Sequence, residues 1–131
     1  MTIIVSWFDD SKTAILREFG ASWTWDEFYE SQTEVNAMLS SVEHKVHQVI
    51  DFRQSNTLPS NTLTHIRNSG RNIPENRGKS IVITRSAFYK QMYKILDLVF
   101  PSITERVIVV ATRDEALKEI GSPNVEDSTL R

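Results

Sequence analysis

The sequence predicts an α/β domain built on a mixed sheet, in which an N-terminal β-hairpin is followed by alternating helices and strands. Short apolar runs rich in β-branched residues alternate with segments whose apolar residues recur at helical spacing. Two helix-capping patterns, Thr24 to Glu27 and Thr112 to Glu115, mark helix starts. The expected order of elements is therefore β-β-α-β-α-β-α-β-α, which favours parallel pairing through right-handed crossovers after the hairpin.

The first two strands are expected at 3–8 and 13–19, where apolar, β-branched and aromatic side chains are concentrated. The polar residues 9–12 between them favour a turn, so the two strands should pair as an antiparallel hairpin. Gly20 then allows the chain to turn away from the hairpin.

The first helix is expected over 25–42. The Thr24 hydroxyl can accept a hydrogen bond from the amide of Glu27, while the Glu27 carboxylate reaches back to the amide of Thr24. Apolar side chains then recur in steps of three and four residues, which places them on one helical face. Gln32 interrupts that face.

The middle of the chain is expected to hold a strand at 46–52, a helix capped by Ser60 and a strand at 80–84. Serine is among the preferred N-cap residues. Residues 80–84 form a short continuous apolar run, which is typical of a strand covered on both faces. Between these two elements, 70–79 is rich in Gly, Asn and Pro and is expected to be a connection.

The last third of the chain predicts a helix, a strand and a short helix. Ser86 can cap the first of these helices and Pro101 ends it. Residues 107–111 form another apolar strand, and Thr112 begins the second capping pattern. The expected apolar face of the helix after Ser86 comprises Phe88, Met92, Ile95, Leu96 and Val99.

Length and composition bound the function classes. A chain of 131 residues fits one domain, which we expect over 1–121, with 122–131 as a disordered polar tail. The chain contains no cysteine, which excludes disulfides and thiolate sites and fits a cytoplasmic location. The net charge of −2 provides no overall attraction to nucleic acid. No stretch approaches the roughly 18 apolar residues of a membrane span.

The order of elements, with an opening hairpin and four helices in about this length, resembles the STAS domain, the fold of bacterial anti-sigma factor antagonists. SpoIIAA-like domains and lipid-binding CRAL-TRIO domains share its general architecture. The resemblance covers roughly 3–120. It implies a non-enzymatic, cofactor-free signalling module that binds a protein partner of the anti-sigma or kinase type.

The local correspondence lies between the third strand and the second helix. In STAS antagonists an acid near the end of a strand is followed by a hydrophobic loop residue and by a phosphorylated serine at a helix start. Asp51 falls on the strand acid, Leu58 on the loop hydrophobe and Ser60 on the phosphorylated serine. A phosphate on Ser60 would lie at the positive end of the helix dipole and add about two negative charges to a docking surface. The alternative is that Ser60 only caps the helix.

Three residues depart from the family's motif. Pro59 stands where the family has aspartate, Asn61 where it has Ser or Thr, and Thr62 where it has glycine. The phosphoswitch is therefore expected in a degenerate form. The candidate phosphoacceptor or interface residues are Asp51, Leu58, Ser60, Asn61 and Thr62.

Two other functions stay open: a carrier of a small apolar ligand or lipid, in a pocket between the sheet and the third helix, and an enzyme of unrecognised type. The enzyme is the less favoured because the glycines are isolated and no nucleophile elbow or metalloprotease pair occurs. Asp51 could be a functional acid at a strand end, but a cap on the following loop is favoured because no partner base or nucleophile is visible.

Metal and nucleic acid are not expected as partners. His44 and His47 lack an acid as a third ligand and lie beyond the predicted helix, so they do not predict a metal site. Aromatic residues left outside the core could line a pocket or a homodimer face. A basic run is interpreted as a solvated loop rather than a nucleic-acid surface. It comprises Arg67, Arg71, Arg77, Lys79 and Arg85.

Overall fold

The computed structural model describes residues 2–55, 58–69 and 74–121. The predicted tail at 122–131 lies outside the described residues. The strands are β1 (Ile3–Trp7), β2 (Ala14–Phe19), β3 (Val46–Asp51), β4 (Arg77–Ile83) and β5 (Val107–Val110). The helices are α1 (Trp25–Ser40), α2 (Thr62–Ser69), α3 (Ala87–Val99), α4 (Pro101–Thr104) and α5 (Arg113–Gly121).

The strands form one sheet in the order β1-β2-β3-β4-β5. β1 and β2 pair antiparallel, with Ile3 opposite Phe19, and every other pair is parallel. The predicted mixed α/β architecture with an N-terminal hairpin is thereby confirmed. The short helix α4, which starts at Pro101, is an addition to the predicted order.

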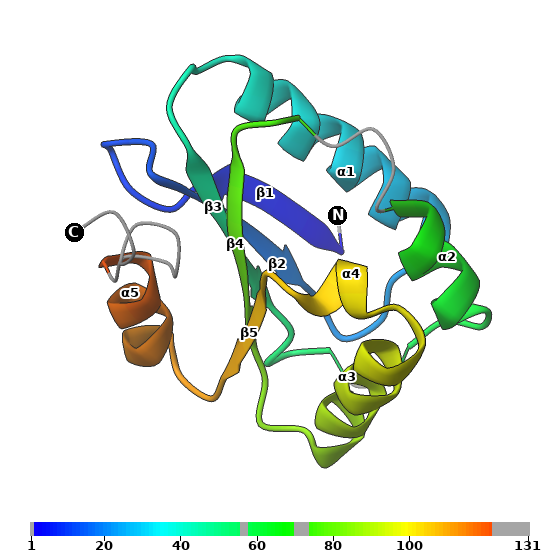
Figure 1. Cartoon of the computed structure of the whole chain (residues 1–131). Coiled ribbons are helices and arrows are strands. Elements are labelled where there is room, and N and C mark those ends of the chain that lie inside the picture. Colours follow the sequence, from blue (N-terminus) through cyan, green and yellow to red (C-terminus); the bar gives the residue numbers. More distant parts are fainter. Residues whose placement is uncertain (1, 56–57, 70–73, 122–131) are drawn as a thin grey trace.

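The helices cover both faces of the sheet (Figure 1). Each parallel crossover moves one strand along in the same direction, and right-handed crossovers of this kind place α1, α2 and α3 on one face. α5 follows the last strand and lies on the opposite face, where Ala116 joins a core with Val49 and Ile81.

The capping predictions for α1 and α3 are confirmed. The Thr24 hydroxyl accepts from the Glu27 amide at 3.2 Å, and the Thr24 amide donates to the Glu27 carboxylate at 3.1 Å. The Ser86 hydroxyl accepts from the amide of Tyr89 at 3.4 Å. These local patterns mark the starts of two helices.

The start of α2 differs from the prediction. The helix begins at Thr62, two residues after the predicted N-cap Ser60. The intervening Asn61 has a φ of 64°, in the left-handed region that asparagine tolerates better than most residues. Because the chain turns at Asn61, Ser60 lies outside the helix and does not occupy the cap position.

The structure also corrects part of the interpretation of the basic run Arg67 to Arg85 as a solvated loop. β4 begins at Arg77, inside the expected connection 70–79, of which residues 70–73 lie outside the described part of the chain. Lys79 is 8% exposed and its Nζ donates to the carbonyl of Glu119 at 2.9 Å, so the solvated-loop interpretation is wrong for this residue. Gly78 permits the close pairing, since a Cβ there would lie 2.4 Å from Nδ1 of His47.

Candidate functional site

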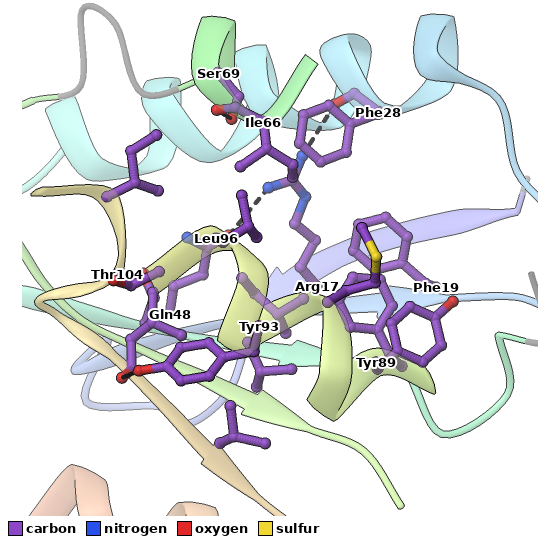
Figure 2. Close-up of a pocket in the computed structure, with 18 of the residues that line it drawn as sticks. Arg17, Phe19, Phe28, Gln48, Ile66, Ser69, Tyr89, Tyr93, Leu96 and Thr104 are labelled. Carbon is purple, nitrogen blue, oxygen red and sulfur yellow. Dashed lines mark hydrogen bonds between the residues drawn. The ribbon is translucent and has the colours of Figure 1, made fainter. Parts of the chain in front are cut away.

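The sheet and the helices on its crossover side enclose a cavity of about 200 Å³. Strands β2 to β5 form its floor, and α1, α2, α3 and α4 contribute its walls. Figure 2 shows side chains from the sheet and from the helices converging on this space, among them Ile66 of α2 and Leu96 of α3. The cavity therefore lies where the third helix was expected to cover the sheet.

The two faces of the sheet are packed differently. On the α5 side, Val49, Ile81 and Ile83 each have an exposed fraction of 0%. On the cavity side, Ile50 and Val82, which neighbour them along the same two strands, are only half-buried. Side chains in mid-sheet that stay half-buried have space above them instead of close-packed neighbours. The cavity, which is partly open to solvent, leaves these two side chains incompletely covered.

Two of the helices over the cavity are loosely held. None of the residues of α2, all of them described, is buried, and α3 buries only Tyr89. Phe88 and Val99 of the predicted apolar face are 53% and 52% exposed, so this part of the prediction is wrong. Met92 and Leu96 of the predicted face do point toward the sheet and line the cavity, together with Tyr89. A helix with few buried residues can move at little cost in free energy.

A buried arginine lies beside the cavity. Arg17 is 2% exposed and extends from β2 toward α1 (Figure 2). Its Nε and Nη2 donate to the Ser31 hydroxyl at 2.9 and 2.7 Å, and Nη2 also donates to the Phe28 carbonyl at 3.0 Å. Its Nη1 donates to the side-chain oxygens of Gln32 at 3.1 Å and Gln48 at 3.2 Å. Burial lowers the pKa of Arg17 to about 9, which leaves it a cation at neutral pH.

The charge that lines the cavity is positive. Arg17 and Arg77 line it, and none of the described lining residues carries a carboxylate. Neither arginine forms an ion pair within the described part of the chain. Burial, followed by the charge of Arg106, lowers the pKa of Arg77, while the nearby carboxylate of Glu105 partly opposes this shift.

The loop before α2 has one side on the cavity and one on solvent. Leu58 and Thr62 line the cavity, whereas Ser60 and Asn61 between them are exposed. The Ser60 carbonyl accepts a hydrogen bond from the indole of Trp25 at 2.6 Å, which attaches the loop to the start of α1. The structure therefore brings four of the five candidate residues together. Their role in an interface stays a prediction.

Comparison with known proteins bears on the fold. No family model matches the chain, and no curated protein sequence is significantly similar to it. Among solved structures, an anti-sigma factor antagonist from Mycobacterium paratuberculosis superposes with a TM-score of 0.58, over 92% of this chain and 94% of that chain, at 17% sequence identity. The chain has a STAS-like fold. At 17% identity, the similarity is evidence for the fold alone.

Within the STAS-like fold, the fifth candidate residue, Asp51, is engaged with its own loop. Its carboxylate accepts hydrogen bonds from the Arg53 amide at 3.0 Å and from Nε and Nη2 of the Arg53 guanidinium at 3.0 and 2.7 Å. Burial acts to raise the pKa of Asp51, but the hydrogen bonds and charge of Arg53 outweigh it and the pKa is lowered. This is the loop-capping geometry that sequence reasoning favoured for Asp51.

Replacing Asp51 by asparagine is expected to lower the free energy of unfolding by about 1 kcal/mol at neutral pH, since the Arg53 guanidinium is partly exposed and screened. A carboxyl with a lowered folded-state pKa stabilises above its unfolded pKa, and that contribution is lost as pH falls through the folded pKa. The difference between wild type and Asp51→Asn should therefore shrink below about pH 4. Urea unfolding at several pH values measures it.

Asp10→Asn is the matched control for this prediction. It removes an exposed carboxylate for which no hydrogen bond occurs among the described residues. A difference between wild type and Asp51→Asn that stays constant from neutral pH to about pH 3 would contradict the expected linkage.

The histidines of the STAS-like domain contact protein groups. His44 Nε2 lies 2.9 Å from the Lys12 carbonyl, and His47 Nδ1 accepts from the Lys79 amide at 2.9 Å. His65 stacks on Trp25, with ring centroids 4.5 Å apart. In the ranges that the structure describes, no cluster of potential metal ligands occurs and no helix has the length and apolar character of a membrane span.

Sequence reasoning missed the polar residues of the cavity. Arg17 stands in the middle of an otherwise apolar strand run, and Gln32 was noted only as an interruption of an apolar helical face. One signal could have identified Arg17 and Gln32: a charged residue in a buried strand next to a helix with one polar residue on its buried face. Using this signal requires knowing which strand faces which helix.

Proposed function

We propose that the chain is a non-enzymatic regulatory module that binds a protein partner, similar in kind to anti-sigma factor antagonists and acting in the bacterial cytoplasm. The fold likeness over nearly the whole chain supports this proposal. The observation that carries it is the exposed stretch at the start of α2, where Ser60, Asn61 and Leu63 face solvent. A phosphate on Ser60 would place negative charge next to the positive end of α2.

Two polar side chains near the proposed interface are engaged with protein groups. The strand-end acid Asp51 is held by Arg53, and Nδ1 of His65 in α2 lies 2.7 Å from the Tyr29 hydroxyl. The proposal therefore assigns the exposed residues Ser60 and Asn61, rather than these two side chains, to partner contact.

Ser60→Asp should weaken partner binding at least about tenfold, since it adds charge to the proposed docking surface. The test uses purified wild type, Ser60→Asp and Ser22→Asp as bait in a quantitative pull-down from the source organism. Ser22 is exposed on the loop before α1 and controls for charge alone. An anti-sigma-type kinase retained by wild type and Ser22→Asp but lost on Ser60→Asp supports the proposal. Equal retention on all three contradicts it.

A second candidate function is the binding of a small apolar ligand. The cavity of about 200 Å³, walled by loosely held helices, favours it. The two functions are compatible because one loop contributes to both surfaces. Leu58 and Thr62 line the cavity, whereas Ser60 and Asn61, which lie between them in the chain, face solvent. A ligand under this loop could alter the surface that a partner contacts.

A further inference from the structure

The cavity contains an uncompensated positive charge that a purely apolar ligand would not need. Arg17 is 2% exposed, and its acceptors are the neutral groups of Ser31, Phe28, Gln32 and Gln48. An ionised group in the interior is costly unless an opposite charge lies beside it. Neutral hydrogen bonds satisfy the N–H groups and leave the net charge in place.

The aromatic rings beside Arg17 offset part of that cost. Its guanidinium carbon lies 4.5 Å from the ring centroid of Phe28 and 5.5 Å from that of Phe19. Such contacts stabilise a desolvated cation by about 2 kcal/mol, less than a buried charge costs. The free protein thus maintains a charge that a bound anion would compensate.

The hydrogen bonds of Arg17 divide into a fixed half and an exchangeable half. Nε and Nη2 bind Ser31 and the Phe28 backbone, which belong to α1. Both bonds of Nη1 go to the amide groups of Gln32 and Gln48, which themselves line the cavity. Nε2 of Gln32 already donates to Asn36 Oδ1 at 3.1 Å, so the exchangeable partner is Gln48. Rotation of the Gln48 amide replaces its oxygen by its NH₂ group. Nη1 and the Gln48 NH₂ group could then both donate to one carboxylate.

The rest of the cavity suits an apolar body of limited size. Its walls near Arg17 come from side chains such as Phe28, Ile66 and Leu96. An engineered protein cavity of roughly 150 Å³ holds benzene, so a space of about 200 Å³ accepts a somewhat larger apolar group.

We propose that the cavity binds a small monocarboxylate with an apolar body, whose carboxylate is held by Arg17 Nη1 together with the amide of Gln48. This inference rests on the second candidate function and gives its ligand class. Arg77, which lines the same cavity, adds positive charge that Glu105 partly offsets. The carboxylate of the ligand would compensate the charge of Arg17, and its apolar body would fill the cavity.

The test compares three probes of equal chain length, octanoate, octanol and octylamine, by isothermal titration calorimetry on the full chain at neutral pH. Octanoate is expected to bind at least about tenfold more tightly than octanol, a difference of roughly 1.4 kcal/mol, and octylamine should bind most weakly. The probes differ in their head groups, so the comparison isolates the charge from the apolar body.

Gln48→Glu supplies the matching change in the protein. The new carboxylate would lie where the Gln48 oxygen now accepts from Arg17 at 3.2 Å, and would compensate its charge from within. Octanoate affinity should then fall at least about tenfold while octanol binding persists. Persistent octanol binding also shows that the variant is folded. Gln91→Glu makes the same chemical change at an exposed position of α3 and should leave octanoate binding unchanged.

The outcomes separate this inference from the function on which it rests. Octanol binding as tightly as octanoate would overturn the carboxylate assignment and leave the apolar-ligand function intact. No binding of any probe to the wild type would overturn both. Equal octanoate affinity for wild type and Gln48→Glu would show that Arg17 does not hold the ligand.

Discussion

Replacing Trp23 by alanine is expected to lower the free energy of unfolding by about 3–5 kcal/mol. Trp23 is 6% exposed and lies in an aromatic cluster with Phe19, Phe28 and Phe52. Its ring contacts Phe19 edge to face, with centroids 4.9 Å apart. Its indole nitrogen donates to the Ser55 hydroxyl at 3.0 Å, which also lies 2.6 Å from the Tyr89 hydroxyl. Trp23 thus contacts β2 and the loop that follows β3, and it is linked to α3 through the Ser55 hydroxyl.

Urea-induced unfolding followed by circular dichroism measures this loss. Trp23→Phe keeps an aromatic ring but removes the hydrogen bond to Ser55, and should lose less than half as much. Phe88→Ala is the matched control, because Phe88 is 53% exposed, and it should lose less than about 1 kcal/mol. A loss of less than about 1 kcal/mol for Trp23→Ala would contradict the packing described here.

Phenylalanine at position 82 is expected to be tolerated, whereas phenylalanine at position 49 is not. Val82 faces the cavity, so a larger ring can enter empty space, and the free energy of unfolding should change by less than about 1 kcal/mol. Val49 is 0% exposed in the core under α5, where overpacking costs about 1–3 kcal/mol or more. The pair makes the same substitution on opposite faces of the sheet, and denaturant unfolding compares them directly. Equal losses for both would indicate that the cavity side is as tightly filled as the α5 side.

The elements with local signals were predictable from the sequence. The hairpin and the capped starts of α1 and α3 depend on residues close together in the chain, such as Thr24 and Glu27. Hydrogen bonds of this kind join residues three apart in the chain, so the pattern can be recognised without knowledge of the tertiary structure.

The errors concern features that only tertiary contacts decide. The turn-forming neighbours of Lys79 predict a loop, but pairing of β4 with β3 draws Lys79 into the sheet. The periodicity of α3 is compatible with more than one buried face, and the cavity leaves Phe88 and Val99 outside. At α2, the left-handed Asn61 delays the helix past Ser60.

The role of Leu58, Ser60, Asn61 and Thr62 as interface residues stays a prediction. The pocket between the sheet and the third helix, expected as an alternative, is present as a cavity. Arg17 was not identified, since its significance comes from burial without a carboxylate partner, which a linear sequence does not display.

The dissociation constant of octanoate for Val82→Phe tests most directly whether the cavity is a ligand site. The new ring would occupy the space that the apolar body of the ligand needs, while Arg17 and its acceptors on α1 stay unchanged. A folded Val82→Phe variant whose dissociation constant is at least about tenfold higher than that of the wild type is the predicted result. The same dissociation constant for both proteins would contradict it, because the ligand would then bind elsewhere.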